Sequence, residues 1–308
     1  MLVHFVASRI RIGKFGYVMG GVGDAGSSSV ADLITFSAET TAAQSAANLS
    51  SARNMLAGMS DGIRYGYSMG GSGVVATADQ TTFAAVTTAA RAAADLSSAR
   101  SGCASVSDFK RYGYSAGGTT GSVVVTTDQT DFSAQTTAVK SSAALSQARQ
   151  LGAGVSDVSR NGYFLGGSTG TVQVTAEQIV FSTATTSAKT SANLSSARSA
   201  LTGVSGPLAG FLIGGIDGAG NPLDLVDKLD FGTQTTSSHA AKLSTARRAV
   251  AGLSDGYKNG WISGGASTLG NQTTSDRLIF AAETISARSA AALSVARRYA
   301  CSFGDYNG

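Results

Sequence analysis

The hexapeptide "GYFLGG" at residues 162–167 joins an apolar run, typical of a buried β-strand, to a glycine pair that suits a sharp turn. The same shape recurs as "GYVMGG" at 16, "GYSMGG" at 66, "GYSAGG" at 113, "GFLIGG" at 210 and "GWISGG" at 260. The second glycines of the six copies are Gly21, Gly71, Gly118, Gly167, Gly215 and Gly265. Self-similarity at this nearly constant spacing indicates a repetitive architecture.

Two further markers keep the same spacing. The first is "LSSAR" or a near-copy, which ends at Arg53, Arg100, Arg149, Arg198, Arg247 and Arg297. The second is an aromatic residue followed four positions later by a threonine, at Phe36, Phe83, Phe132, Phe181, Phe231 and Phe280. Three markers in fixed order predict one body built from repeats of about 49 residues.

One repeat, residues 149–198, contains four candidate strands. The first, "LGAGVS" at 151–156, is built from small residues that suit a crowded centre, and "GYFLGG" is the second. The third, "VQVTAEQIVF" at 172–181, alternates and is rich in β-branched residues, whereas "STATTSAK" at 182–189 is polar enough for an outer edge. Alanine-rich segments such as "TTAARAAADLSSAR" favour helix on propensity, but they lack an apolar stripe, so we interpret them as connectors with a short helical turn.

Four short strands per repeat and a glycine pair give a pattern that resembles the kelch-like β-propellers. The resemblance covers about residues 14 to 308 and rests on the glycine pair, the arginine after a polar turn, and an acidic residue ahead of the third strand. The acidic residues are Asp32, Asp79, Asp128, Glu177, Asp227 and Asp276. The tryptophan and proline of the kelch pattern are absent. The resemblance implies an all-β, six-bladed kelch-like propeller with four antiparallel strands per blade.

The two ends of the chain carry complementary parts of one repeat. The C-terminal "RRYACSFGDYNG" copies "RRAVAGLSDGYKNG" at 247–260 and supplies a first strand, whereas the recognisable repeat begins at Gly16 with a second strand. We therefore expect residues 299–305 to complete the blade opened by residues 16–52, which removes free sheet edges. Residues 1–13 then form an N-terminal arm outside a propeller of residues 14–308. The alternative is that the arm supplies the inner strand of the first blade.

Composition limits the classes of function. With 43% hydrophobic and 14% charged residues the chain is too apolar for disorder, and no apolar run approaches the ~20 residues of a membrane span. The net charge of +4 comes from 23 basic and 19 acidic residues without a lysine cluster, so we expect neither nucleic acid nor membrane insertion. Cys103 and Cys301 lie in repeats that are not neighbours, and we expect no disulfide between them.

The residues needed for common catalytic sites are scarce. His4 and His239 are the two histidines, too few for a His-rich metal site, and no Ser-His-Asp arrangement is evident. Galactose oxidase, a copper enzyme on a kelch-like propeller, needs two histidines, tyrosines and a crosslinked cysteine that we do not find here. Asp217, Asn221 and Asp224 offer oxygen ligands for calcium, but their spacing matches no EF-hand loop and suits ordinary turns. We predict no enzyme activity, no catalytic residue, no cofactor and no metal.

The six repeated arginines admit two interpretations. A ring of guanidinium groups could hold a phosphate, a sulfate or a sugar acid. Alternatively, one arginine per blade could bond the backbone carbonyls of the neighbouring blade and hold the blades in register. We favour the second interpretation and treat the arginines and the second glycines as structural repeat residues. Recognition is then expected in the loops after the glycine pairs, which vary most, as in "GVGDAGSSSVAD" and "GIDGAGNPLDLVD".

Near-identical units rich in serine, threonine, alanine and glycine resemble the kelch-type propellers of bacteriophage tail fibres and other virion proteins. The resemblance implies a non-enzymatic structural or adhesion component of a tail fibre or capsid surface. We expect it to bind other virion proteins and, as a second ligand, a glycan or receptor on the host surface, in a multi-copy assembly. Because no signal peptide is evident, we expect synthesis in the host cytoplasm and release in the virion. Two alternatives remain: a cellular kelch-like scaffold and, less favoured, a galactose-oxidase-like or glycan-active enzyme.

Overall fold

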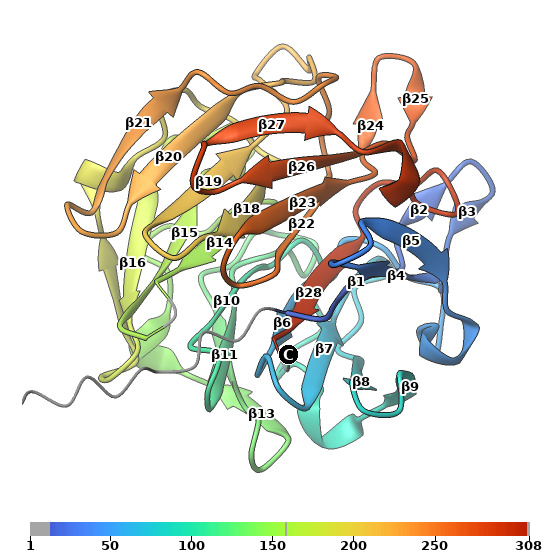
Figure 1. The fold of residues 1–308 in the computed structure, drawn as a ribbon. Helices are drawn as coiled ribbons and strands as arrows, with labels where there is room; N and C mark the ends of the chain where they lie inside the picture. Colours follow the sequence, from blue (N-terminus) through green and yellow to red (C-terminus); the bar gives the residue numbers. More distant parts are fainter. Residues whose placement is uncertain (1–12, 158, 307–308) are drawn as a thin grey trace, which may run out of the picture.

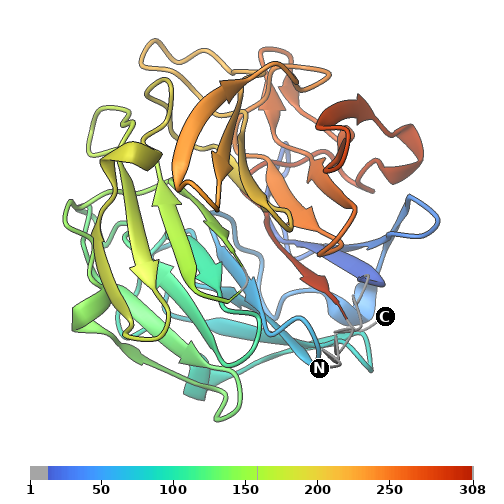
Figure 2. The ribbon, with the colours of Figure 1, turned by 60° about the vertical axis from the view of Figure 1, so that its left-hand side comes forward.

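The computed structural model describes residues 13–157 and 159–306, which form six four-stranded antiparallel sheets arranged around one axis (Figures 1 and 2). This arrangement confirms the six-bladed β-propeller. We number the blades by the repeat that supplies their second strand. Blade 1 contains, from the axis outward, β28 (Cys301–Asp305), β1 (Phe15–Met19), β4 (Ala31–Thr35) and β5 (Thr40–Ala43).

The other blades follow the chain without interruption and have the same order from the axis outward. Blade 2 contains β6 (Ala57–Ser60), β7 (Tyr65–Met69), β8 (Ala78–Thr82) and β9 (Thr87–Ala90). Blade 3 contains β10 (Ala104–Ser107), β11 (Tyr112–Ala116), β12 (Thr127–Asp131) and β13 (Thr136–Val139). Blade 4 contains β14 (Ala153–Ser156), β15 (Asn161–Leu165), β16 (Ala176–Val180) and β17 (Thr185–Ala188).

Blade 5 contains β18 (Thr202–Ser205), β19 (Ala209–Ile213), β20 (Val226–Asp230) and β21 (Thr235–His239). Blade 6 contains β22 (Ala251–Ser254), β23 (Asn259–Ser263), β26 (Ser275–Ile279) and β27 (Thr284–Ala287). Two small hairpins stand outside the blades: β2 (Val22–Gly23) with β3 (Gly26–Ser27), and β24 (Ala266–Ser267) with β25 (Gly270–Asn271).

Five of the six connectors between blades carry a single 3₁₀ turn where alanine propensity had suggested helix, and the connector between blades 5 and 6 carries none. The turns are η1 (Ser45–Ala47), η2 (Ala92–Ala94), η3 (Ser141–Ala143), η4 (Thr190–Ala192) and η5 (Ser289–Ala291). The third strand is shorter than the predicted 172–181 because the residues after the glycine pair form a loop, and the fourth is shorter than the predicted 182–189 because residues 181–184 form the turn between the two strands. The repeated acidic residue also lies within the third strand, at its second position, and not ahead of it.

Small residues in the inner strands are required by the close approach of neighbouring backbones. A Cβ atom on Gly154 would lie 1.9 Å from the Ser105 carbonyl oxygen, and one on Gly203 would lie 2.1 Å from the Gly154 carbonyl oxygen. Because real Cβ atoms do not approach carbonyl oxygens this closely, side chains at these positions would force the blades apart. The predicted crowded centre is therefore present.

Ring closure occurs as predicted. β28 pairs antiparallel with β1, in a register that runs from Phe15 opposite Asp305 to Met19 opposite Cys301. The C-terminal strand thus fills the inner position of blade 1, and the alternative in which the N-terminal arm fills it is wrong. Residues 1–12 of the predicted arm lie outside the described residues. Gly13, the last residue of that arm, donates its backbone N–H to the Asp255 carbonyl at 2.8 Å.

The aromatic markers pack between blades. In each blade a large aromatic residue of the second strand faces the repeated phenylalanine of the next blade, with ring centroids 4.6–6.1 Å apart. The stacked pairs are Tyr17–Phe83, Tyr67–Phe132, Tyr114–Phe181, Tyr163–Phe231, Phe211–Phe280 and Trp261–Phe36. The core is therefore divided into layers between blades. In the part of the chain that the structure describes, no helix has the length and apolar character of a membrane span.

Removing an aromatic side chain from the closing strand should destabilise the whole ring. Phe303 is 5% exposed and stacks on Tyr17 with ring centroids 5.6 Å apart. We expect Phe303→Ala to cost about 3–5 kcal/mol of unfolding free energy, measured by urea denaturation. The control is Leu208→Ala, at a side chain that is 81% exposed; it should stay within about 0.5 kcal/mol of wild type. Equal losses would show that closure does not depend on this strand.

Three buried tyrosines should make stability fall at high pH. Burial raises the pKa of Tyr67, Tyr114 and Tyr163 to about 12, although each hydroxyl also has a glutamine partner that acts in the opposite direction. Because the unfolded pKa is about 10, the folded state holds these protons more tightly. This contribution is fully present below pH ~10 and is lost as the pH rises towards 12. The measurement is a spectroscopic pH titration of the native protein. If the absorbance of tyrosinate showed these three tyrosines titrating with the unfolded pKa of about 10, their raised pKa would be contradicted.

Candidate functional site

The structure places each repeated arginine against the repeated carboxylate of the next blade. All twelve side chains are at most 4% exposed, and the shortest nitrogen–oxygen distances are 2.5–3.0 Å. The pairs are Arg53–Asp79, Arg100–Asp128, Arg149–Glu177, Arg198–Asp227, Arg247–Asp276 and Arg297–Asp32. The last pair joins blade 6 to blade 1, so the set runs around the closed ring.

Arg100 shows how one pair connects two blades. Its Nη2 donates to Asp128 Oδ2 at 2.6 Å, and its Nη1 donates to the carbonyls of Gly117 at 3.1 Å and Thr126 at 2.6 Å. These acceptors belong to blade 3. The carbonyl of Arg100 itself accepts the backbone N–H of Gly71, in blade 2, at 2.9 Å. The residue therefore bonds one blade through its backbone and the next blade through its side chain.

The rest of the repeated sequence serves the same contact. In "LSSAR" the buried Leu96 anchors the connector, and the backbone N–H of Ser97 donates to Asp128 Oδ2 at 2.9 Å. The first glycine of the pair, Gly70, has φ +65°, and a Cβ there would lie 2.4 Å from the Arg100 carbonyl oxygen. Glycine is thus required both by the left-handed conformation and by the approach of the arginine backbone.

These contacts leave the guanidinium groups turned away from solvent. Burial lowers the pKa of Arg149, Arg198 and Arg247 from its usual value, and the paired carboxylate opposes that effect. An anionic ligand would have to displace the carboxylate and break backbone hydrogen bonds of the neighbouring blade. These contacts join neighbouring blades. We therefore look for a ligand-binding site in other parts of the molecule.

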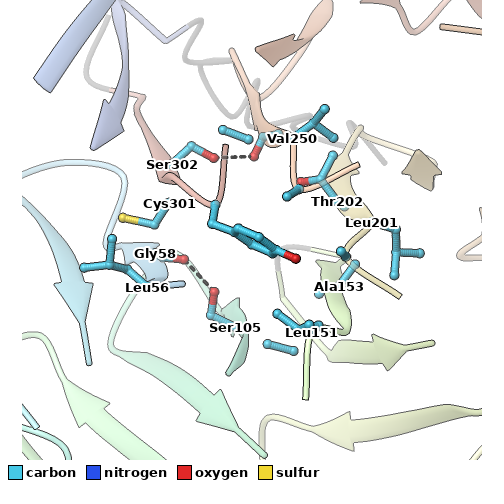
Figure 3. A pocket seen from close by; sticks show the side chains of 18 of the residues that line it. Leu56, Gly58, Ser105, Leu151, Ala153, Leu201, Thr202, Val250, Cys301 and Ser302 are labelled. Carbon is cyan, nitrogen blue, oxygen red and sulfur yellow. Dashed lines mark hydrogen bonds between the residues drawn. The ribbon is translucent and has the colours of Figure 1, made fainter. Parts of the chain in front are cut away.

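A channel on the propeller axis contains two chambers, of about 160 and 90 Å³. They share a waist to which each blade contributes one inner-strand residue: Gly58, Ser105, Gly154, Gly203, Gly252 and Ser302. The Ser105 and Ser302 hydroxyls donate to the carbonyls of Gly58 at 2.7 Å and Gly252 at 2.8 Å (Figure 3). The larger chamber lies towards the face that carries the glycine-pair loops and the arginine connectors, which we call the loop face. The smaller lies towards the turns that join first and second strands, the turn face.

A ring of six backbone hydrogen bonds surrounds the mouth of the larger chamber. One residue just before each inner strand donates its N–H to the carbonyl of the equivalent residue in the preceding blade, at 2.7–2.9 Å. The residues are Met55, Gly102, Leu151, Ala200, Ala249 and Tyr299, and all have φ between 51° and 67°. Five of them are not glycine, so the left-handed conformation costs energy that the closed ring of bonds offsets. We call this set the mouth ring.

An aromatic pair covers the smaller chamber at the turn face. The Tyr306 ring packs edge to face on Phe109 with centroids 5.1 Å apart, and the Tyr306 N–H donates to the Gly62 carbonyl at 2.7 Å. Cβ atoms on Gly62 and Gly256 would lie 2.5 and 3.0 Å from the tyrosine ring. Tyr306, which directly follows the C-terminal strand β28, therefore lines this end of the channel together with Phe109, a placement that the sequence did not predict.

The loop face is uneven because two neighbouring blades carry protruding hairpins. β2–β3 follows the glycine pair of blade 1 and β24–β25 follows that of blade 6, and both project from the ring on the same side (Figure 1). Asn271 Nδ2 donates to Asp24 Oδ1 at 2.7 Å, and Arg298 Nη1 donates to Asn271 Oδ1 at 2.9 Å. Leu269, at the tip of the second hairpin, is 91% exposed.

The other side chains that could ligate a metal or react chemically form bonds within their own turns or between strands. Asp217 Oδ1 accepts the backbone N–H groups of Ala219 and Asn221, so its carboxylate organises its own turn. Cys103 and Cys301 are free cysteines among the residues of the larger chamber; their thiols donate to the Gly117 carbonyl and to the Ser68 hydroxyl, and burial raises the pKa of each to about 11. Within residues 13–157 and 159–306, no cluster of three metal-ligating side chains occurs. His4 lies outside the described residues.

Two ionic clusters between blades were missed by the sequence analysis. Glu283 of blade 6 bonds Lys228 and His239 of blade 5, and these partners, Lys228 foremost, hold its pKa below the usual value. Glu39 of blade 1 pairs likewise with Arg277 and Arg288 of blade 6. Glu39 and Glu283 are equivalent positions of two repeats, and that spacing was the available signal. His239 thus serves blade packing.

No protein-family model matches this sequence, and no curated protein matches it.

Breaking one arginine–carboxylate pair should be severe. We expect Arg100→Leu to cost about 3–5 kcal/mol in urea denaturation, because Asp128 is left buried and unpaired. The double variant with Asp128→Leu should recover much of that loss, though not all, since the Ser97 N–H and hydroxyl lose their carboxylate acceptor and the carbonyls of Gly117 and Thr126 lose the guanidinium donor. Arg111→Leu removes a pair with Asp131 whose arginine is 62% exposed, and it should cost about 1 kcal/mol or less. Equal effects of Arg100→Leu and Arg111→Leu would refute the structural role.

Proposed function

We propose that this chain is a non-enzymatic structural or adhesion component of a virion. It binds other virion proteins through one face of the propeller and a host-surface glycan or receptor as a second kind of ligand. The absence of a metal-ligating cluster within residues 13–157 and 159–306 and the engagement of the repeated arginines in blade contacts favour binding over catalysis.

The observation that carries the proposal is the pair of hairpins on blades 1 and 6. In these two blades the loop after the glycine pair forms a hairpin of two-residue strands, and Asp24, Asn271 and Arg298 hold the two hairpins together. A protruding feature cross-linked by hydrogen bonds presents a defined surface and loses little conformational freedom on binding. Leu269 at its tip supplies an apolar contact that has no neighbour within the ring.

The rigid ring suits display in many copies. Contacts that run continuously around six blades keep the hairpins in one orientation, so several copies on a particle can engage a surface together. Avidity in such an array can exceed the affinity of one site by ~100-fold or more. A modest contact area at the hairpins is then sufficient for adhesion.

Variants of the hairpins test the proposal. The purified chain is immobilised and exposed to bacterial cells from a strain panel and to proteins from dissociated virions of phages that infect those strains. We expect binding to one of these, and we expect Leu269→Ala combined with Asp24→Ala to weaken it about tenfold or more, as loss of central contacts does. Leu208→Ala, on the turn face, serves as the matched control and should leave binding unchanged. Absence of binding to both cells and virion proteins, or equal loss in the control, would contradict the proposal.

A further inference from the structure

We propose that the larger axial chamber binds one neutral monosaccharide unit, the end of a glycan chain, at the loop face. This inference rests on the proposed function and names the class of ligand that the adhesion component would take. The inference rests on three properties of this chamber: its volume, its uncharged lining and its hydrogen-bonding groups. The hydrogen bonds of the mouth ring fix the shape of its entrance.

Charge decides against an anionic ligand. Of the described residues that line the chamber, none is Asp, Glu, Lys or Arg. The six arginines that end the "LSSAR" motifs are paired with carboxylates behind the glycine pairs. A phosphate, a sulfate or a sugar acid would lose hydration here without meeting a compensating charge, which is costly. A neutral polar ligand avoids that cost.

The walls offer hydrogen bonds suited to hydroxyl groups. Thr202, Ser105, Ser302 and Tyr299 line the chamber (the first three are labelled in Figure 3). The hydroxyl hydrogens of Ser105 and Ser302 are given to waist carbonyls, so their oxygens remain acceptors. Each inner strand is paired on one side only, so part of its backbone N–H and C=O groups has no partner within its sheet. Sugar hydroxyls can donate and accept, and can satisfy both kinds of group.

Volume limits the ligand to a single ring. A cavity of ~150 Å³ is known to accept benzene, and pockets for drug-sized ligands begin near ~300 Å³. The chamber, at about 160 Å³, thus matches one six-membered ring. A pyranose ring fits this size, whereas a disaccharide would have to leave its second unit outside the mouth.

The mouth also has an apolar side. Met55, Leu151 and Tyr299 are the large members of the mouth ring, and each is partly exposed. Gly102, Ala200 and Ala249 fill the other three positions. A tyrosine ring combines an apolar face, on which the C–H face of a sugar can lie, with a hydroxyl that can bond to it. The mouth ring is thus unequal around the axis, so one ligand can bind in one orientation.

The test is saturation-transfer NMR and calorimetry with free D-glucose, D-galactose, D-mannose and N-acetylglucosamine. N-acetylneuraminic acid and glucose 6-phosphate are the anionic comparisons. We expect one or more neutral sugars to bind with a Kd on the order of 1 mM, and no binding of the anionic sugars.

Substitutions within the mouth ring have built-in precedents. Tyr299→Ala introduces alanine, which already occupies two other positions of the mouth ring. Ala249→Tyr introduces tyrosine, which already occupies position 299. Because both residue types adopt the left-handed conformation in this ring, both variants should fold. We expect Tyr299→Ala to weaken sugar binding about tenfold through loss of the aromatic contact. Ala249→Tyr should abolish it by filling the mouth. Leu208→Ala, on the opposite face, should bind sugar as wild type does.

Three results would overturn the inference: no binding of any neutral sugar tested, equal binding of the anionic sugars, or sugar binding that survives Ala249→Tyr. The outcomes separate this inference from the proposed function. If Ala249→Tyr still binds cells or virion proteins but no sugar binds the wild type, the chamber assignment fails and the adhesion proposal stands. If a sugar binds in the chamber while neither cells nor virion proteins bind the protein, the adhesion proposal fails and the chamber assignment stands.

Discussion

The buried arginine–carboxylate pair between successive blades is the interaction on which the rest of this structure depends. A charge moved out of water is stable only if its partner and its remaining hydrogen bonds are in place. Here the arginine, the carboxylate, the serine N–H and the carbonyls beside the glycine pair meet at one point, as the contacts of Arg100 show. The repeated sequence markers are therefore the components of one contact.

That dependence explains which features could be predicted from the sequence. Strand order and ring closure follow from local spacing, since a first strand at 299–305 lacks a second and Gly16 begins a second strand without a first. The arginine–carboxylate partnership was harder, because the residues lie in different repeats and the acid was placed ahead of its strand. No pattern in the sequence predicted the mouth ring. Leu151 and Tyr299 adopt left-handed conformations that non-glycine residues rarely take, and only the backbone bonds of a closed ring enforce them.

The residues that recur in every repeat and those that do not have different roles. The repeated ones hold the blades together, and none of the described residues that line the channel is charged. The unrepeated ones create the asymmetry: Tyr299 at one mouth, Tyr306 over the other, and the hairpins linked by Asn271. The C-terminal segment supplies two of these three features as well as the closing strand. Ring closure and the proposed recognition features are thus coupled through the same few residues.

Native-state hydrogen exchange would test the central claim, that the pairs make six blades one cooperative unit. Repeat proteins without closure open repeat by repeat, because each repeat contacts only its neighbours. The account predicts that inner-strand and mouth-ring amides of all six blades exchange with one common free energy, equal to that of global unfolding. Earlier exchange in any single blade, blade 1 in particular, would show that the blades open separately and would contradict it.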